Sequence, residues 1–176
     1  MPAAFFTGVV ALSIPLWILG ALPQSELRNL LPFNLPISAL TALCPGVAAV
    51  ALPSAPGYAF DPLAGRLGVR LAAVVLALFW ASWHAIPFVE TGHDADWVVG
   101  QTIATAGLRV IIVCLYVGAG GSVLAPIVFH AMTNVSDFMF PVNGYYDPFV
   151  TGILVLLLAA VALRVMPRGA TRRSAP

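Results

Sequence analysis

Residues 69–89, VRLAAVVLALFWASWHAIPFV, contain one arginine near their start and, before His84, no other strongly polar side chain. A helix of about 20 apolar residues is long enough to cross the hydrocarbon core of a bilayer. This stretch therefore predicts a transmembrane helix. His84 lies inside it, and an ionisable side chain at membrane depth is costly, which makes it a candidate for function.

Apolar stretches of similar length recur along the chain, at about 3–22, 35–52, 98–117, 122–140 and 148–166. The stretch at 35–52 is the weakest, because prolines interrupt it, and it is equally compatible with a broken or re-entrant segment. Hydrophobic residues make up 60% of the chain, charged residues make up 9%, and lysine is absent. The sequence therefore predicts an all-α, polytopic transmembrane helical bundle of about five to six spans. We expect one transmembrane domain over 1–166 and a disordered cytoplasmic tail over 167–176.

The few charges divide between the two sides of this predicted bundle. Arg66, Arg70 and the arginines from Arg164 onward fall on one side, whereas Glu90 and the acidic residues after it fall on the other. Because arginine is enriched in cytoplasmic loops, both termini are expected in the cytoplasm. The net charge of +1 and the lack of a basic stripe argue against a nucleic-acid partner. The partner predicted by composition is the lipid bilayer.

His130 and Asn134 provide the clearest pair of polar residues within an apolar stretch. Four residues apart on a helix, they share one face, with about 6 Å between their Cβ atoms. An imidazole can transfer a proton, and an amide can donate hydrogen bonds to a developing oxyanion, so the pair is suited to half of a hydrolytic site. The alternative is a helix–helix contact, because polar side chains commonly join membrane helices.

Other polar residues carry weaker signals. Arg109 lies midway along its apolar stretch, where a guanidinium needs a carboxylate, carbonyl groups or water beside it. His93 is close to two aspartates, but these residues are interpreted as a solvated acidic loop rather than a metal site. Cys44 and Cys114 fall in apolar segments and are expected to be buried, unpaired thiols.

Three motifs resemble the CAAX-protease and bacteriocin-processing (CPBP, Abi-type) membrane proteins. They are Trp80-xxx-His84-Ala-Ile-Pro-Phe, the segment from Gly121 to Ser136 that contains His130-xxx-Asn134, and Gly144-Tyr-Tyr-Asp147-Pro148. The resemblance is strongest over 57–163. It implies an intramembrane endopeptidase that cleaves membrane-associated or prenylated peptides near the C-terminus, and a location in the bacterial plasma membrane. Its catalytic residues would be His84, His130 and Asn134, with Trp80 in place of the family's usual Phe.

The family's first motif, Glu-Glu-xxx-Arg, has no counterpart in this chain. It normally precedes a stretch similar to Gly57–Leu63, but residues 51–56 here read ALPSAP and contain no carboxylate. We infer an internal loss of at least one span and of the glutamate that serves as general base, which predicts impaired hydrolysis. The alternative is a catalytically inactive relative that acts as a membrane peptide-binding or immunity-type protein. Older family schemes place a divalent metal such as zinc at these groups, and His84 and His130 alone would form an incomplete zinc site.

Three acidic residues were considered as substitutes for the missing base. Glu90 follows His84 by six residues, which on a continuous helix is about 240° around the axis, and Pro87 is expected to kink or end the helix between them. Asp61 and Glu26 fall in loops that the sequence does not place. The span boundaries also predict that His84 and His130 differ in depth by about 10 Å, a gap that helix tilt or shifted boundaries would have to close if the two share a site.

Overall fold

The computed structural model describes residues 2–21, 40, 44, 60–90, 92–139 and 146–166, with side chains from residue 6 to residue 136 and from 146 to 166 within these ranges. They form the helices α1 (Pro2–Ala21), α3 (Phe60–Leu67), α4 (Val69–Glu90), α5 (Ala95–Gly118), α6 (Leu124–Met139) and α7 (Pro148–Val165). No strand occurs among these residues. The predicted all-α fold is confirmed.

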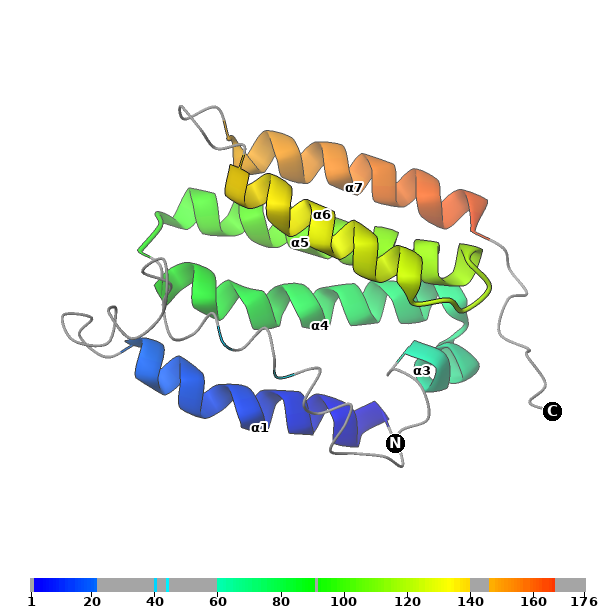
Figure 1. The fold of residues 1–176 in the computed structure, drawn as a ribbon, viewed down its shortest axis with the longest axis horizontal. Helices are drawn as coiled ribbons and strands as arrows, with labels where there is room; N and C mark the ends of the chain where they lie inside the picture. Colours follow the sequence, from blue (N-terminus) through cyan, green and yellow to red (C-terminus); the bar gives the residue numbers. More distant parts are fainter. Residues whose placement is uncertain are drawn as a thin grey trace.

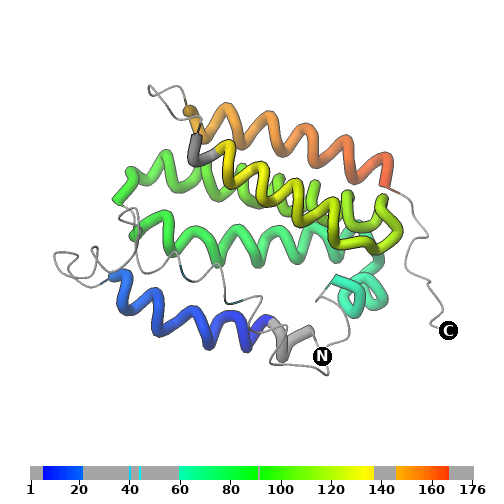
Figure 2. The backbone as a smooth tube through the Cα atoms, in the orientation of Figure 1, coloured from blue at the N-terminus to red at the C-terminus, as the bar shows by residue number. Residues whose placement is uncertain are grey.

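The four longest helices, α1, α4, α5 and α7, lie side by side in one layer (Figure 1). Helix α6 crosses in front of α5, and the short α3 lies at the end of the bundle where α4 begins. The path of the backbone shows that α1 begins and α7 ends at this same end (Figure 2). Within this layer, only α4 and α5 are antiparallel neighbours joined by a short connection, whereas α6 separates α5 from α7 in the chain.

Helices α4, α5 and α7 are long and apolar enough to cross a membrane, as predicted for 69–89, 98–117 and 148–166. Helix α6 has 16 residues, so its length of about 24 Å falls short of a bilayer core of about 30 Å. Pro87 does not end its helix, one of the two predicted outcomes, because α4 continues through it to Glu90. The described residues do not include the predicted tail at 167–176. Of the stretch at 35–52, they include only Leu40 and Cys44.

The predicted separation of charges is present at the two ends of the bundle. Where α4 begins and α7 ends, Arg70 Nη2 donates a hydrogen bond to the carbonyl of Arg164 at 3.1 Å. At the opposite end, Asp94 accepts a hydrogen bond from the backbone N–H of Trp97 and caps α5, and Asp147 caps α7 in the same way. Helix N-termini favour such carboxylates, so two of the predicted loop acids are capping residues.

Small residues allow α5 and α7 to pack closely. A Cβ atom added to Gly100 would lie 2.8 Å from backbone atoms of Pro148 and Phe149, and one added to Gly152 would lie 3.0 Å from the carbonyl oxygen of Gly100. Farther along α5, Gly107 faces Val155. Helices in membranes gain their packing energy mainly from such close approach, because lipid is as apolar as the side chains it replaces.

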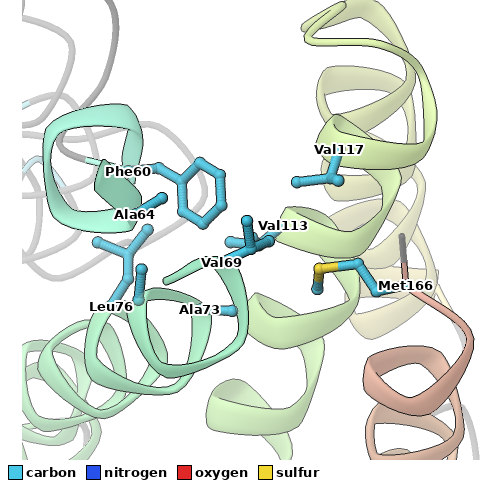
Figure 3. Packing of buried hydrophobic residues seen from close by; sticks show 9 residues of the cluster. Phe60, Ala64, Val69, Ala73, Leu76, Val113, Val117 and Met166 are labelled. Atoms are coloured by element: carbon cyan, nitrogen blue, oxygen red, sulfur yellow. The ribbon is translucent and has the colours of Figure 1, made fainter. Parts of the chain in front are cut away.

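The end of the bundle near α3 is held by a cluster of buried apolar residues (Figure 3). Phe60 and Ala64 of α3 pack on the first turns of α4 and on Val113 and Val117 of α5. Met166, directly after α7, belongs to the same cluster. Helix α3 was not predicted, because its eight residues are too few for a membrane span.

Trp83 joins α1 to α4. Its indole Nε1 donates a hydrogen bond to Ser13 Oγ at 2.9 Å, and Ser13 in turn donates to the carbonyl of Val9 at 2.8 Å. Trp83 is 4% exposed and packs with Val9 and Cys44, so it is a core residue, not the interface anchor that a membrane tryptophan suggests. The two cysteines are unpaired as expected; Cys44 is buried and Cys114 is half-buried.

We expect Ser13→Ala to lower the free energy of unfolding by about 1 kcal/mol or more, because it leaves the buried Trp83 N–H without its acceptor. Thermal unfolding in detergent micelles measures this effect. Ser82→Ala is the matched control, since the Ser82 hydroxyl is exposed and bonds only to the carbonyl of Leu78 one turn before it. An equal loss of stability in both variants would contradict the proposed role of Ser13.

Candidate functional site

His84 is held on α4 in a defined orientation. Its Nδ1 lies 2.9 Å from the carbonyl oxygen of Trp80. A carbonyl only accepts hydrogen bonds, so Nδ1 carries the proton and Nε2 is left with a free lone pair. The imidazole packs against the rings of Trp80 and Trp83, with centroids 4.7 and 4.6 Å apart. The ring is thus held with Nδ1 toward the Trp80 carbonyl, and Nε2 takes no part in that bond.

Trp80 connects His84 to Arg109. The guanidinium carbon of Arg109 on α5 lies 4.4 Å from the centroid of the Trp80 ring, which is a cation–π contact. The same tryptophan contacts the imidazole one turn farther along α4. An aromatic residue at position 80 therefore orients the histidine and also stabilises a charge from the neighbouring helix.

Arg109 is the costly charge expected midway along this apolar stretch, and its guanidinium lies over the ring of Trp80. Its Nε is buried and has no hydrogen-bond partner among the described residues. The Trp80 ring stabilises the positive charge but supplies no oxygen acceptor. The guanidinium therefore retains unused hydrogen-bonding capacity.

A partly open cavity of about 200 Å³ lies beside Arg109 and is lined by residues of α3, α4, α5 and α6 and by Val123, which precedes α6. Arg109, His130 and Tyr116 contribute its polar groups, and the rest of the lining is apolar. Phe60, Leu76 and Val113, seen packed together in Figure 3, form part of its wall. The other lining residues are Ile112, Tyr116, Val123, Pro126 and Ile127.

Helix α6 carries His130 and Asn134 on one face, as their spacing predicts. Both side chains are exposed, and none of the described side chains of α6 is buried. His130 lines the cavity, whereas Asn134, one turn farther along, does not. Helix α6 follows a turn in which Gly120 and Gly121 both adopt positive φ angles, a conformation that glycine allows.

The three groups His84, His130 and Arg109 lie within electrostatic range of one another. His84 is 15 positions after the start of α4 and His130 is six after the start of α6, a difference of nine residues, or about 13 Å of helix length. Helix α6 crosses obliquely in front of α5 (Figure 1). His84 does not line the cavity that contains His130. Arg109 lines the cavity together with His130 and also contacts the Trp80 ring, which in turn contacts His84. Arg109 therefore links the two histidines.

The acidic residues considered as substitutes are placed differently. Glu90 lies on the same continuous helix as His84, so it points about 240° away around the axis. Asp61, in the first turn of α3, accepts a hydrogen bond from Tyr116 at 3.0 Å, and Tyr116 lines the cavity. The sequence held no signal for this pairing of residues 55 positions apart. Glu26 and residues 51–56 lie outside the described part of the chain.

The described residues do not fit a zinc ion. Within them, no group of three or more His, Cys, Asp or Glu side chains is close enough to hold a metal. Protein zinc sites use at least three such ligands, and His84 and His130 supply two. The His93 loop is also explained without a metal, because the His93 ring stacks on Trp97 at 3.7 Å while Asp94 caps α5.

Comparison with known proteins gives two matches. Residues 56–136 match the family described as type II CAAX prenyl endopeptidase Rce1-like. A CAAX prenyl protease 2 of Methanococcus maripaludis is 26% identical over 116 residues, which cover 61% of this chain and 42% of that protein. The match thus spans about two fifths of the relative's length. No solved structure matches the chain.

Both matches agree with a polytopic membrane protein. Residues 56–136 include the positions of the second and third motifs, with His84, His130 and Asn134 among them. This segment is therefore similar to the Rce1-like CAAX prenyl endopeptidases, which confirms the family resemblance seen in the motifs.

Proposed function

We propose that this protein is an intramembrane endopeptidase of the CAAX-processing type that acts near the C-terminus of membrane-associated or prenylated peptides, and that its hydrolytic step is impaired. The observation that supports the reaction class is His84, whose protonated Nδ1 faces the Trp80 carbonyl and leaves Nε2 as a base. In this proposal the membrane is the bacterial plasma membrane, with both termini cytoplasmic.

In the proposed reaction, His84 Nε2 accepts a proton from the water that attacks the peptide carbonyl. His130 and Asn134, on one face of α6, donate hydrogen bonds to the oxygen that gains negative charge. The attack forms the C–O bond, and cleavage of the C–N bond releases an amine that takes back the proton from His84. No metal is part of this scheme.

The proposed impairment rests on the missing carboxylate. Among the described residues, no hydrogen bond or ion pair joins His84 or His130 to an acidic side chain, and Asp61 is connected to the cavity wall through Tyr116. An imidazole without a carboxylate partner is a less effective base, because nothing stabilises its protonated form. The second candidate, an inactive peptide-binding relative, is favoured by the same observation.

Cleavage of a prenylated peptide in proteoliposomes tests the proposal, with the products identified by mass spectrometry. We expect cleavage slower by at least about 100-fold than that of the archaeal CAAX prenyl protease 2 assayed in parallel, since general-base help contributes about 10²–10⁴-fold. His130→Ala is expected to lower this residual rate by a further factor of about 10² while membrane insertion stays intact.

Three outcomes separate the candidates. Slow cleavage that depends on His130 supports the impaired endopeptidase. Peptide binding with no product after prolonged incubation supports the inactive relative. Cleavage that persists unchanged in His130→Ala removes this residue from the mechanism.

A further inference from the structure

The cavity beside His130 combines an apolar wall with one unsatisfied cation. Arg109 lines it, and the Nε of Arg109 has no partner among the described residues. A guanidinium binds a carboxylate through two parallel N–H···O bonds, which a neutral ligand cannot match. By charge complementarity, the occupant of this cavity carries an anionic group on an apolar body.

The depth of Arg109 in the membrane limits which anionic groups can reach it. It lies nine residues before the end of α5 at Gly118, which is about 14 Å along the helix. A helix of 24 residues extends about 36 Å, so with α5 upright and centred across a bilayer core of about 30 Å, Arg109 would lie about 10 Å below the headgroup layer. A lipid phosphate would have to leave the headgroup layer to reach it. A carboxylate at the end of a short apolar peptide segment would not.

We propose that Arg109 is a specificity-determining residue that binds the free C-terminal carboxylate of the peptide, with the last apolar side chain of the peptide in the cavity. The inference rests on the proposed function, because it assumes that the site accepts peptides. It adds a selection rule: peptides that end in a free carboxylate bind, and the same peptides with a terminal amide bind poorly. His130 lines the same cavity, so the bond to be cut lies within a few residues of the bound terminus.

Equilibrium binding to the full chain in phosphatidylcholine nanodiscs tests this rule. The probes are two fluorescent apolar pentapeptides with N-methylated internal amides, one ending in a carboxylate and the other in a carboxamide. We expect the wild-type protein to bind the acid about 10- to 100-fold more tightly than the amide, as for a charge-assisted hydrogen bond. Arg109→Gln should abolish this preference, and Arg109→Lys should retain part of it because the charge remains.

Arg66→Gln is the matched control, because Arg66 is an exposed arginine on α3 and does not line the cavity. It should leave the ratio of acid to amide affinity unchanged. This ratio separates a binding role from a structural one, since a loss of folding lowers the affinity for both peptides equally.

The remaining outcomes overturn one proposal or the other. If the wild-type protein binds neither peptide, the proposed function fails. If it binds acid and amide equally, or if Arg109→Gln keeps the preference, only the role of Arg109 fails. If palmitate competes for Arg109 while the peptides show no acid preference, the occupant is a lipid carboxylate and the peptide rule is wrong.

Discussion

Replacing His84 with phenylalanine is expected to lower the residual rate of peptide cleavage by about 10²–10⁴-fold, the usual contribution of a general base. Phenylalanine keeps the aromatic packing against Trp80 and Trp83 but removes the nitrogen that accepts the proton. Because no carboxylate contacts His84 in the described structure, no second base is in place to compensate. The initial rate of product formation in proteoliposomes measures the effect.

His93→Phe is the matched control for this substitution. His93 is exposed, stacks on Trp97 and lies in the loop at the acidic end of the bundle. It should leave the cleavage rate within about 2-fold of the wild type, since substitutions at exposed positions away from a site have small effects. Unchanged cleavage in His84→Phe would show that the proton is accepted elsewhere, and Asp61→Asn would then be the next variant to assay.

Gly100→Val is expected to destabilise the bundle by about 3 kcal/mol, at the upper end of the cost of overpacking. The added Cβ would lie 2.8 Å from the backbone nitrogen of Phe149 and from the backbone carbon of Pro148. Backbone atoms cannot rotate away as a flexible side chain can, so the first turn of α7 must move. That turn is also where Asp147 caps the helix. Thermal unfolding in detergent micelles measures the loss.

Gly118→Val provides the matched control on the same helix. A Cβ atom at Gly118 would meet no atom within 4 Å, so this variant carries no packing cost and only the small difference in helix propensity between glycine and valine. We expect its stability to stay within about 0.5 kcal/mol of the wild type. Equal destabilisation of both variants would mean that helix propensity, and not the α5–α7 contact, determines the effect.

Much of the fold was predictable from the periodicity and length of apolar stretches. The spans at 69–89, 98–117 and 148–166 correspond to α4, α5 and α7, because a membrane helix is defined by local composition. Pro87 does not end its helix, because α4 continues for three more residues to Glu90. Helix α3 was missed because a single amphipathic segment of eight residues carries no signal of membrane crossing.

The candidate site was predictable in its members but not in their arrangement. The pairing of His130 with Asn134 follows from helical spacing alone, and the motifs directed attention to His84. The contact of Arg109 with Trp80 joins two helices, as does the bond from Tyr116 to Asp61. Contacts between helices depend on their relative rotation and crossing angle, which the apolar pattern of a membrane protein leaves nearly free.

The sequence by itself therefore determined the all-α membrane bundle, the charge difference between its two ends and the identity of the polar residues inside it. These properties are local, since they depend on the composition of each segment and on the cost of placing charge in lipid. Only the tertiary structure decided that Arg109 faces a cavity with His130, that Trp83 is a core residue and that α5 and α7 meet at glycines. The physical reason is that each of these facts depends on which faces of two distant helices pack together.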